Sequence, residues 1–486
     1  MSDGQILPWV VILPLGAAIV TVLLPHAWRT AASMAAIAPQ LLAAVLLLRD
    51  LVVLGPHTYA LADHAAPLGI ALLADGPGTT LVLLTAVVAG VCFVHAAASL
   101  RGLSANAHFW PLAWFLWAAL NTIWLSADLF NLYVGLELLG LAAVGLVALK
   151  GSAEALAAAM RYLLAALLGS LAYLLGVALF YGAYGTLALA DLQALATPGT
   201  TTMVALAFMT LGLLLKTALF PLHAWLPPAH GGALPPVSAL LSALVIKASF
   251  FILLRLWFAL GSDAASLALA WMLGLLGAGA VFWGGWMAWR QTRLKHLVAY
   301  STVAQIGYLF LFFPLVAGAA PHAAALAWDG TMLMLVSHAL AKAGMFLAAG
   351  NLVLATGSPR IVDLSGISRF RPLSLLGFGL AGVSVMGLPP SGGFTAKWLL
   401  LQSALTSGQW GWIAVLVFGS LLSAAYVFKV FRHSFVEGPK RDHFESPSVV
   451  LELGALALAL AAIAVGLAAH APLAWLRIGT PYGVPG

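Results

Sequence analysis

The sequence predicts an all-α polytopic membrane protein with about fourteen transmembrane helices, and three observations support this fold class. Of the 486 residues, 63% are hydrophobic and only 7% are charged, whereas about 25% of the residues in a soluble domain are charged. Apolar runs such as 81–100 reach the roughly 20 residues that a helix needs to cross about 30 Å of hydrocarbon. These runs are continuous, whereas a transmembrane barrel would alternate apolar and polar residues over ~10-residue segments. The composition therefore excludes a soluble globular protein.

Apolar windows bounded by Gly, Pro and charged residues define the expected spans. They cover residues 6–25, 31–54, 76–99, 108–127, 128–149, 155–184, 201–226, 236–260, 264–289, 296–319, 323–355, 373–405, 410–433 and 448–472. The longest polar stretch is the loop near 437–448, so no separate soluble domain is expected. The whole of 1–486 is therefore interpreted as one membrane domain.

The basic residues give an independent indication of topology, because loops that stay in the cytoplasm keep Lys and Arg. Fourteen of the 21 basic residues follow odd-numbered spans: Arg29, Arg101, Lys150, Arg161, Arg290, Arg293, Lys295, Arg360, Arg369, Arg371, Lys429, Arg432, Lys440 and Arg441. Arg49, Arg255 and Arg477 lie at or beyond the other ends. We therefore predict a multi-pass protein of the cell inner (cytoplasmic) membrane with both termini on the outer (periplasmic) side. Topology also explains the net charge of +6, so no nucleic-acid partner is expected.

Four lysines remain that topology does not explain, because all of them lie within expected spans: Lys216, Lys247, Lys342 and Lys397. A lysine at the centre of a span costs about 2.5 to 3.5 kcal/mol on insertion scales. A buried lysine recovers part of that cost by pairing with a negative charge or by releasing its proton, and ready proton release is what a proton relay requires. One or two such lysines could snorkel or form structural ion pairs. Four near span centres favour the relay.

Glu137 supplies a complementary negative charge well inside the fifth expected span. If it faces Lys216, each group favours the charged form of the other, and a change in their separation alters how tightly the lysine holds its proton. Asp128 lies nine residues earlier, where a helix N-terminus and interfacial water can satisfy it. Asp128 is interpreted either as a helix cap or as a channel mouth that gives protons access.

The segment 216–247 carries the densest polar pattern. Lys216 and His223 are seven residues apart, about two helical turns, and would lie near one face if the helix continued. Pro221 interrupts it, and such a break frees backbone carbonyls that must line a polar cavity in a membrane. His223 and His230 could extend a proton path because imidazole exchanges protons near neutral pH. A metal site at these histidines is disfavoured, since no Cys or carboxylate ligand is nearby.

The second half of the chain carries a similar pattern. His338 and Lys342 are four residues apart on one helix face. The segment 293–309 follows a basic patch with Ser301, Thr302 and Gln305, which are candidates for proton access through bridging water. For these three side chains alone, ordinary helix packing is the favoured interpretation.

Two apolar segments of the chain are interrupted by proline and each carries a lysine, at 216–228 and at 387–397. In the second, Pro-Pro and Gly-Gly pairs come directly before Lys397. Paired interrupted helices are typical of transporters with inverted repeats. The single Cys92 provides no thiolate cluster, and we expect no cofactor, no metal and no catalytic chemistry of the chain's own.

At these residues the sequence resembles the antiporter-like proton-conducting membrane subunits of respiratory complex I, membrane-bound hydrogenases and Mrp-type cation/proton antiporters. The wording SADLFNLYVGLE at 126–137 is most similar to the Mrp D-type subunit, and FPLHAWLPPAH at 220–230 is closer to complex I and hydrogenase subunits. The chain departs from the usual pattern at Pro228, where many relatives have Asp, and at 231–232, where polar residues are common in place of Gly-Gly. Because of these departures, the resemblance alone does not assign proton access at His230.

The resemblance implies fourteen helices, two inverted five-helix repeats, broken seventh and twelfth helices, and a polar axis at the membrane midplane. It divides the chain into helices 1–3 (1–105), a first repeat of helices 4–8 (106–260), a second repeat of helices 9–13 (261–435), and helix 14 with the C-terminus (436–486). The proton-translocation residues that it implies are Glu137, Lys216, Lys247, His338, Lys342 and Lys397.

The leading hypothesis is therefore a proton-translocating subunit of a multisubunit cation/proton antiporter. The alternative is a proton-pumping subunit of a complex I-like or membrane-bound hydrogenase redox complex. Both imply other membrane subunits as partners, besides protons, the lipid bilayer and, for the antiporter, Na⁺ or K⁺. A quinone- or haem-binding enzyme is disfavoured because the helical histidines pair with lysines in the sequence. A silent scaffold would not need four midmembrane lysines and two broken helices.

Overall fold

A computed structural model describes residues 6–60, 64, 69–261, 267–436 and 447–483. The first half comprises α1 (Ile6–Leu23), α2 (His26–Leu54), β1 (His57–Ala60), β2 (Ala71–Ala74), α3 (Gly76–Ser99), α4 (Ala105–Leu125), α5 (Leu129–Ala148), α6 (Ala153–Tyr184), α7 (Leu189–Leu195), α8 (Thr200–Thr217), α9 (Leu226–Gly232), α10 (Pro235–Leu240), the π-helix η2 (Leu241–Val245), α11 (Ile246–Leu256) and the π-helix η3 (Trp257–Gly261). The second half comprises α12 (Leu267–Arg290), α13 (Leu294–Phe310), α14 (Phe312–Val316), α15 (Pro321–Thr356), the 3₁₀ helix η4 (Ile361–Leu364), α16 (Ile367–Phe370), α17 (Pro372–Met386), α18 (Gly392–Thr406), α19 (Trp410–Phe435), α20 (Val449–Leu467) and α21 (His470–Arg477).

Within the described residues, twelve helices are long and apolar enough to cross a membrane. Each of them falls on one of the expected spans, so the helical multi-pass fold class is confirmed. The two remaining expected spans coincide with α4 and with the pair α17 and α18, which are not among these twelve. The count of fourteen spans and the two inverted repeats stay predictions.

The structure differs from the expected spans in three places. A two-stranded antiparallel hairpin, β1 paired with β2, lies between α2 and α3, and windows of helical length cannot detect four-residue strands. The helix expected over 201–226 ends at Thr217, and residues 218–225 form turns before α9. The helix expected over 373–405 is broken at 387–391. Both breaks fall where the sequence places proline inside an apolar run, because proline lacks the donor that continues a helix.

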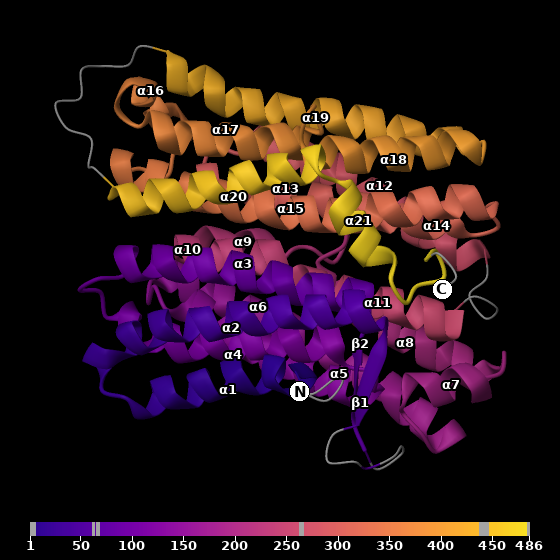
Figure 1. Cartoon of the computed structure of the whole chain (residues 1–486). Helices are drawn as coiled ribbons and strands as arrows, with labels where there is room; N and C mark the ends of the chain where they lie inside the picture. Colours follow the sequence, from indigo (N-terminus) through magenta and orange to yellow (C-terminus); the bar gives the residue numbers. More distant parts are fainter. Residues whose placement is uncertain (1–5, 61–63, 65–68, 262–266, 437–446, 484–486) are drawn as a thin grey trace.

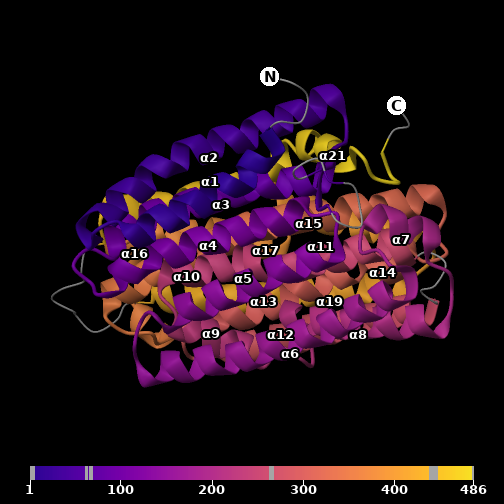
Figure 2. The ribbon, with the colours of Figure 1, turned by 90° about the horizontal axis from the view of Figure 1, so that it is seen from below.

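The helices run side by side along one direction, with the first half of the chain below and most of the second half above in Figure 1. Seen from below, α2 lies at one edge of the bundle and α6 at the opposite edge (Figure 2). The central helix is α15, which packs against α3, α10, α13, α17, α18 and α20. The membrane-crossing part of α15 is fully buried inside the chain, as is that of Pro235–Leu260, whereas only about a third of the residues of α1 and α2 are buried. Polar groups on α15 and on Pro235–Leu260 are therefore well isolated from the outer surface of the bundle.

Close contacts between glycines bring neighbouring helices together in both halves. A Cβ atom at Gly212 of α8 would lie 2.3 Å from the carbonyl oxygen of Gly169 in α6. A Cβ atom at Gly307 of α13 would likewise lie 2.3 Å from the carbonyl oxygen of Gly277 in α12. Small residues allow such backbone approach in membrane helices, where lipid provides no hydrophobic driving force for association. These contacts hold the helices that carry Lys216 and the 293–309 polar segment.

The connections meet at two opposite ends of the bundle. At one end, Arg293 bonds Glu154 at 2.8 Å and forms a β-bridge with Arg360, and Lys429 donates to the carbonyl of Gln291. At the other end, the backbone N–H of Gly76 donates to the carbonyl of Ile478. We refer to these as the basic end and the opposite end. The basic end gathers most of the residues from which topology was predicted, although Lys440 and Arg441 lie outside the described residues.

Two of the basic residues attributed to topology have structural roles in the interior. Lys295 was expected in a loop, but it lies in the first turn of α13 with 9% exposure, because that helix begins at Leu294. Arg255 of α11 forms an ion pair with Asp75, its Nη1 3.0 Å from Oδ2. A count of charges cannot separate these residues from loop charges, since both sit within a few residues of a span end.

Candidate functional site

Lys216, in the last turn of α8, carries an ammonium group with no hydrogen-bond partner in the described chain. Its side chain crosses toward α5 and α6, where a Cβ atom at Gly140 would lie 3.8 Å from Nζ and one at Gly169 would lie 3.0 Å from Cγ. The surrounding cavity, of about 20 Å³, is lined by Tyr162 of α6 and Ser249 of α11 among others. Such a volume holds about one water molecule, which would satisfy the ammonium group.

Glu137 lies on α5 less than one turn before Gly140, the residue that Lys216 approaches. No ion pair joins it to Lys216 within the described chain, but the two charges are close enough to interact electrostatically. Asp128 acts as the N-cap of α5, because its Oδ1 accepts from the backbone N–H of Asn131 at 2.8 Å. The helix-cap interpretation of Asp128 is thus the one that its contacts support.

The break after α8 separates Lys216 from His223. Ala218 adopts the left-handed conformation with φ of 56° and ends the helix. The carbonyl of Leu215 accepts from the indole N–H of Trp225 at 3.0 Å. His223 accepts from the indole N–H of Trp283 in α12 at 3.1 Å. The expectation that Lys216 and His223 would share one helix face required a continuous helix, and the two residues instead contact different neighbours.

Lys247 is 1% exposed and lies just after the π-helix η2. Its Nζ donates to the carbonyl oxygen of Ser242 at 2.8 Å. The hydroxyl of the same Ser242 lies 2.9 Å from the hydroxyl of Thr302 in α13. A π-turn disturbs the regular carbonyl ladder and is frequent at functional sites. Ser242 therefore connects a buried lysine of the first half to the polar segment of α13.

Lys342 of α15 is fully buried and reaches α13 from the other side. Its Nζ donates to the carbonyl of Val298 at 2.9 Å and to the hydroxyl of Ser301. Thr302 also donates to the Val298 carbonyl, at 3.1 Å. Ser242 accepts from Lys247 at its carbonyl and contacts Thr302 through its hydroxyl, and the Val298 carbonyl accepts from both Thr302 and Lys342, so a series of neighbouring polar groups spans the distance between the two lysines. We call this series the central polar chain.

Two buried histidines border the central polar chain without a partner for either ring nitrogen in the described part of the protein. They are His230 of α9, with no exposure, and His338 of α15, with 3% exposure. His338 interacts electrostatically with Lys247, Lys342 and Lys397, so it is within electrostatic range of both the central polar chain and the last lysine. His230 stacks on Phe346 at 4.8 Å between ring centroids. Buried polar nitrogens without a partner are costly, and ordered water would satisfy them.

Lys397 of α18 is held by the break that precedes it. Its Nζ donates to the carbonyls of Val385 at 3.1 Å and Met386 at 3.2 Å, which end α17, and to the hydroxyl of Ser420 in α19 at 3.1 Å. It also lies 4.4 Å from the ring centroid of Tyr308. The break therefore supplies the carbonyls that the ammonium group needs, as predicted for a broken membrane helix.

Gln305 lies farther along α13 on the same side as Tyr308. Its Nε2 donates to the hydroxyl of Ser423 at 3.2 Å, and Ser423 lies one turn after Ser420 in α19. The carbonyl oxygen of its side chain is buried without a partner among the described residues, as is the hydroxyl of Tyr308. Gln305 thus belongs to the surroundings of Lys397, whereas Ser301 and Thr302 belong to the central polar chain.

A cavity of about 240 Å³ at the basic end is lined by Gly231, the residue that follows His230 in the chain. Its lining includes Lys295, whose Nζ donates to the carbonyl of Ala233, and His296. The ring of His296 occupies the space beside Gly231, since a Cβ atom there would lie 2.3 Å from it. His230 in turn interacts electrostatically with Lys295, His296, Lys247 and Lys342. His296 was not among the residues predicted from the sequence, and only its position next to Lys295 could have indicated it.

The described residues hold no group of three or more His, Cys, Asp and Glu side chains that could bind a metal ion. The site consists instead of lysines, histidines and hydroxyls that can exchange protons. Its lysines lie on α8, α11, α15 and α18, its histidines on α9 and α15, and its hydroxyls on η2 and α13, so it crosses from the first half of the chain to the second.

Residues 126–423 match the family model described as NADH:quinone oxidoreductase/Mrp antiporter, TM. The chain belongs to this family. The match covers every residue of the central polar chain and both broken helices. The family resemblance suggested by the sequence is therefore confirmed.

Individual relatives come from both branches of the family. The chain is 37% identical to the N subunit of the NADH-quinone oxidoreductase of Desulforudis audaxviator over 81% of this chain and 78% of that protein. It is 27% identical to the D-type subunit of the Na(+)/H(+) antiporter of Alkalihalophilus pseudofirmus over 90% and 87%. Among solved structures, a chain of the Mrp complex from Dietzia sp. DQ12-45-1b aligns with a TM-score of 0.87 at 25% identity, covering 97% of this chain and 96% of that one. A chain of the archaeal membrane-bound sulfane sulfur reductase aligns with a TM-score of 0.88 at 25% identity and the same coverage.

Proposed function

We propose that this chain is the proton-translocating subunit of a multisubunit membrane complex. The observation that carries the proposal is the central polar chain, in which Lys247 and Lys342 are joined through hydroxyl and carbonyl groups across α13. Hydroxyls both donate and accept hydrogen bonds, whereas backbone carbonyls only accept, so the Ser242–Thr302 hydroxyl pair can pass a proton and bound water carries it between this pair and the two lysines. Family membership supports the proposal independently.

In this proposal protons move between Lys216, Lys247, Lys342 and Lys397, with His338 between the last two. Glu137 sets how tightly Lys216 holds its proton, because a nearby negative charge stabilises the ammonium form. Water fills the gaps where no direct contact exists, beginning with the cavity beside Lys216. Lys295, His296 and His230 give access from the cavity at the basic end.

We further propose that the basic end faces the cytoplasm, so that both termini face the outside of the cell membrane. The positive-inside rule supports this orientation, since the basic loops gather at one end. Other membrane subunits are the expected partners, because the similar solved structures include the Mrp complex and the membrane-bound sulfane sulfur reductase.

A cation/proton antiporter is the leading assignment for the complex, and Na⁺ or K⁺ is the expected exchanged ion. Relatives named as the D-type subunit of Na(+)/H(+) antiporters match over about nine tenths of the chain. The alternative is a redox-driven complex, and the 37% identity to an NADH-quinone oxidoreductase protein favours it. Proton flux in vesicles that contain the assembled complex distinguishes the two, because an antiporter responds to added Na⁺ or K⁺ and a redox complex responds to electron donors.

The central polar chain is tested by Thr302→Val, which removes the hydroxyl that joins Ser242 to the Val298 carbonyl but keeps the side-chain shape. We expect proton flux in vesicles to fall at least about tenfold, as is typical when a proton-transfer group is lost. Thr331→Val is the matched control, because Thr331 is buried on α15 and its hydroxyl has no partner in the described chain. Normal flux in the Thr302 variant would contradict the proposed path.

A further inference from the structure

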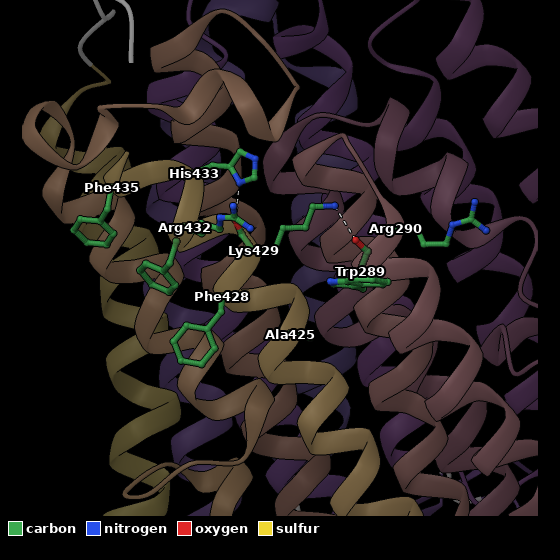
Figure 3. Close-up of a pocket in the computed structure, with 9 residues that line it drawn as sticks. Trp289, Arg290, Ala425, Phe428, Lys429, Arg432, His433 and Phe435 are labelled. Carbon is green, nitrogen blue, oxygen red and sulfur yellow. Dashed lines mark hydrogen bonds between the residues drawn. The ribbon is translucent and has the colours of Figure 1, made fainter. Parts of the chain in front are cut away.

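A groove between α12 and α19 opens on the outer surface of the bundle at its basic end (Figure 3). Its volume is about 800 Å³, which is within the range of sites for drug-sized ligands. The lining residues are Trp289, Arg290, Ala425, Phe428, Lys429, Phe431, Arg432, His433 and Phe435. A groove of this size accommodates a molecule much larger than a water or a single inorganic anion.

Every charged side chain in the lining is basic, and no Asp or Glu among the described residues contributes to it. Lys429 donates to the carbonyls of Trp289 and Gln291, each at 2.7 Å, so it caps the end of α12. Arg290 and Arg432 are exposed and donate no hydrogen bond within the described chain. Their guanidinium groups are therefore available to an anion, and planar guanidinium binds phosphate through paired hydrogen bonds.

Most of the rest of the lining is aromatic and continues onto an exposed apolar surface. Phe428 is 58% exposed, and Trp286, one turn before Arg290, is 46% exposed. Aromatic side chains at a membrane interface place their rings at the level of the lipid headgroups. Basic groups at the membrane surface with an apolar face below match one ligand, in which a phosphate is attached to acyl chains.

We propose that the groove between α12 and α19 binds the headgroup of an anionic phospholipid. The phosphate contacts Arg432, which lies beside Lys429 and His433, while Arg290 on the other side of Lys429 adds to the positive charge of the groove (Figure 3), and the first part of the acyl chains lies along Phe428 and Trp289. Basic pockets between transmembrane helices are known to bind anionic lipid headgroups at this depth. The site is separate from the lysines of the proton path, so this proposal does not depend on the proposed function.

The test uses the full chain in its assembled complex, stripped of lipid and titrated with phosphatidylglycerol or phosphatidylcholine while bound lipid is counted by native mass spectrometry. Phosphatidylglycerol should bind at least about tenfold more tightly than phosphatidylcholine, because only the former has a net negative charge. The double variant Arg290→Gln, Arg432→Gln should weaken phosphatidylglycerol binding about thirtyfold, which corresponds to about 2 kcal/mol for two charges near the surface. Equal binding of the two lipids by the unmodified complex would overturn the proposal.

The matched control is Arg101→Gln, Arg161→Gln, which removes two exposed charges from elsewhere on the bundle without touching the groove. Its phosphatidylglycerol binding should stay within about twofold, since the local contacts are retained. Inorganic phosphate at the lipid concentration should not displace the lipid, and complete displacement would overturn the proposal by assigning the site to a free anion. A photo-crosslinking phenylalanine analogue at position 428 should label lipid, and labelling of a neighbouring protein instead would overturn it by identifying the groove as a protein interface.

Discussion

Lys216 and Lys397 occupy related positions next to the two helix breaks, yet their surroundings differ. Lys216 lies before its break, with no hydrogen bond to the described chain, in a cavity of about 20 Å³ and within electrostatic range of Glu137. Lys397 lies after its break and donates to two carbonyls and a hydroxyl. The ammonium group of Lys216 therefore faces a negative charge, whereas that of Lys397 is held by neutral hydrogen-bond acceptors.

The difference follows from which side of the break carries the lysine. The carbonyls that a break sets free belong to the helix that ends there, namely Leu215 in α8 and Val385 and Met386 in α17. Lys397 follows its break and can fold back onto those carbonyls. Lys216 precedes its break, and Trp225 occupies the Leu215 carbonyl instead. The only charged group that interacts with Lys216 among the described residues is Glu137, which is why we propose that it sets the proton affinity of this lysine.

The largest expected effect is from loss of either lysine. Lys216→Ala and Lys397→Ala should each abolish proton flux in vesicles of the assembled complex, because sites in series are each required. The double variant should be no worse than either single variant. Assembly should be retained in both, whereas a structural ion pair would lose about 3 to 5 kcal/mol when one partner is removed.

Lys216→Arg refines this test, since guanidinium keeps the positive charge but does not release its proton. Proton flux should be abolished in this variant, as in Lys216→Ala. Normal flux in this variant would show that Lys216 acts as a fixed charge and takes no part in proton exchange.

The next largest effect should come from Glu137→Gln, which removes the charge near Lys216 but keeps the side-chain shape. We expect proton flux to fall at least about tenfold, because an opposite charge nearby shifts the pKa of a group by about one unit or more. Glu452→Gln is the control: Glu452 is a buried carboxylate on α20 that accepts from Ser374 at 2.8 Å, far along the chain from either break. Equal losses of proton flux in the Glu137 and Glu452 variants would contradict the proposed role of Glu137 in setting the proton affinity of Lys216.

Replacing Pro389 and Pro390 with Ala should straighten the junction of α17 and α18, since alanine favours a continuous helix. The carbonyls of Val385 and Met386 would then bond within the helix and leave Lys397. Proton flux should fall severalfold while the thermal unfolding temperature of the complex changes little. A loss of stability without a loss of flux per assembled complex would show that the break serves folding alone.

The smallest effect should come from Ser420→Ala, which removes one of three acceptors of Lys397. Flux should fall by a factor of about two to five, because the two carbonyls still hold the ammonium group and a single neutral hydrogen bond contributes about 0.5 to 1 kcal/mol net. Ser434→Ala is the matched control in the same helix, where the hydroxyl bonds only the Val430 carbonyl of its own turn. A large loss in the Ser420 variant would mean that the hydroxyl itself carries the proton.

Much of the fold was predictable because membrane insertion imposes long apolar helices, and the two breaks were predictable because proline cannot continue a helix. The buried lysines were also identifiable, since any charge near a span centre requires an explanation. Contacts between residues distant in sequence were not predictable. Ser242, Val298 and Ser420 give no chemical signal of their own, and their role depends on which helices pack together.

Two residues show why spacing alone was misleading. His223 would lie near Lys216 only in a continuous helix, and the break expected at Pro221 begins with the turn at Ala218, but a sequence pattern does not give the direction of a chain after a break. Lys295 was expected in a loop, because it lies directly after the first residue of α13 and the exact start of a helix cannot be located that finely. Its burial became evident only from the packing of α13 against α9.

The π-helix at Leu241–Val245 has a mechanical consequence for Lys247. A π-turn holds one residue more than an α-turn, so the bulge acts as a dislocation that can be shifted along the helix while both ends stay in place. Moving it past Lys247 would rotate that residue by about 100° around the helix axis, the angle of one residue in an α-helix. The ammonium group would then leave the Ser242 carbonyl. The extra residue of the π-turn therefore determines which way Lys247 points around the helix axis, and with it whether the ammonium group reaches the Ser242 carbonyl.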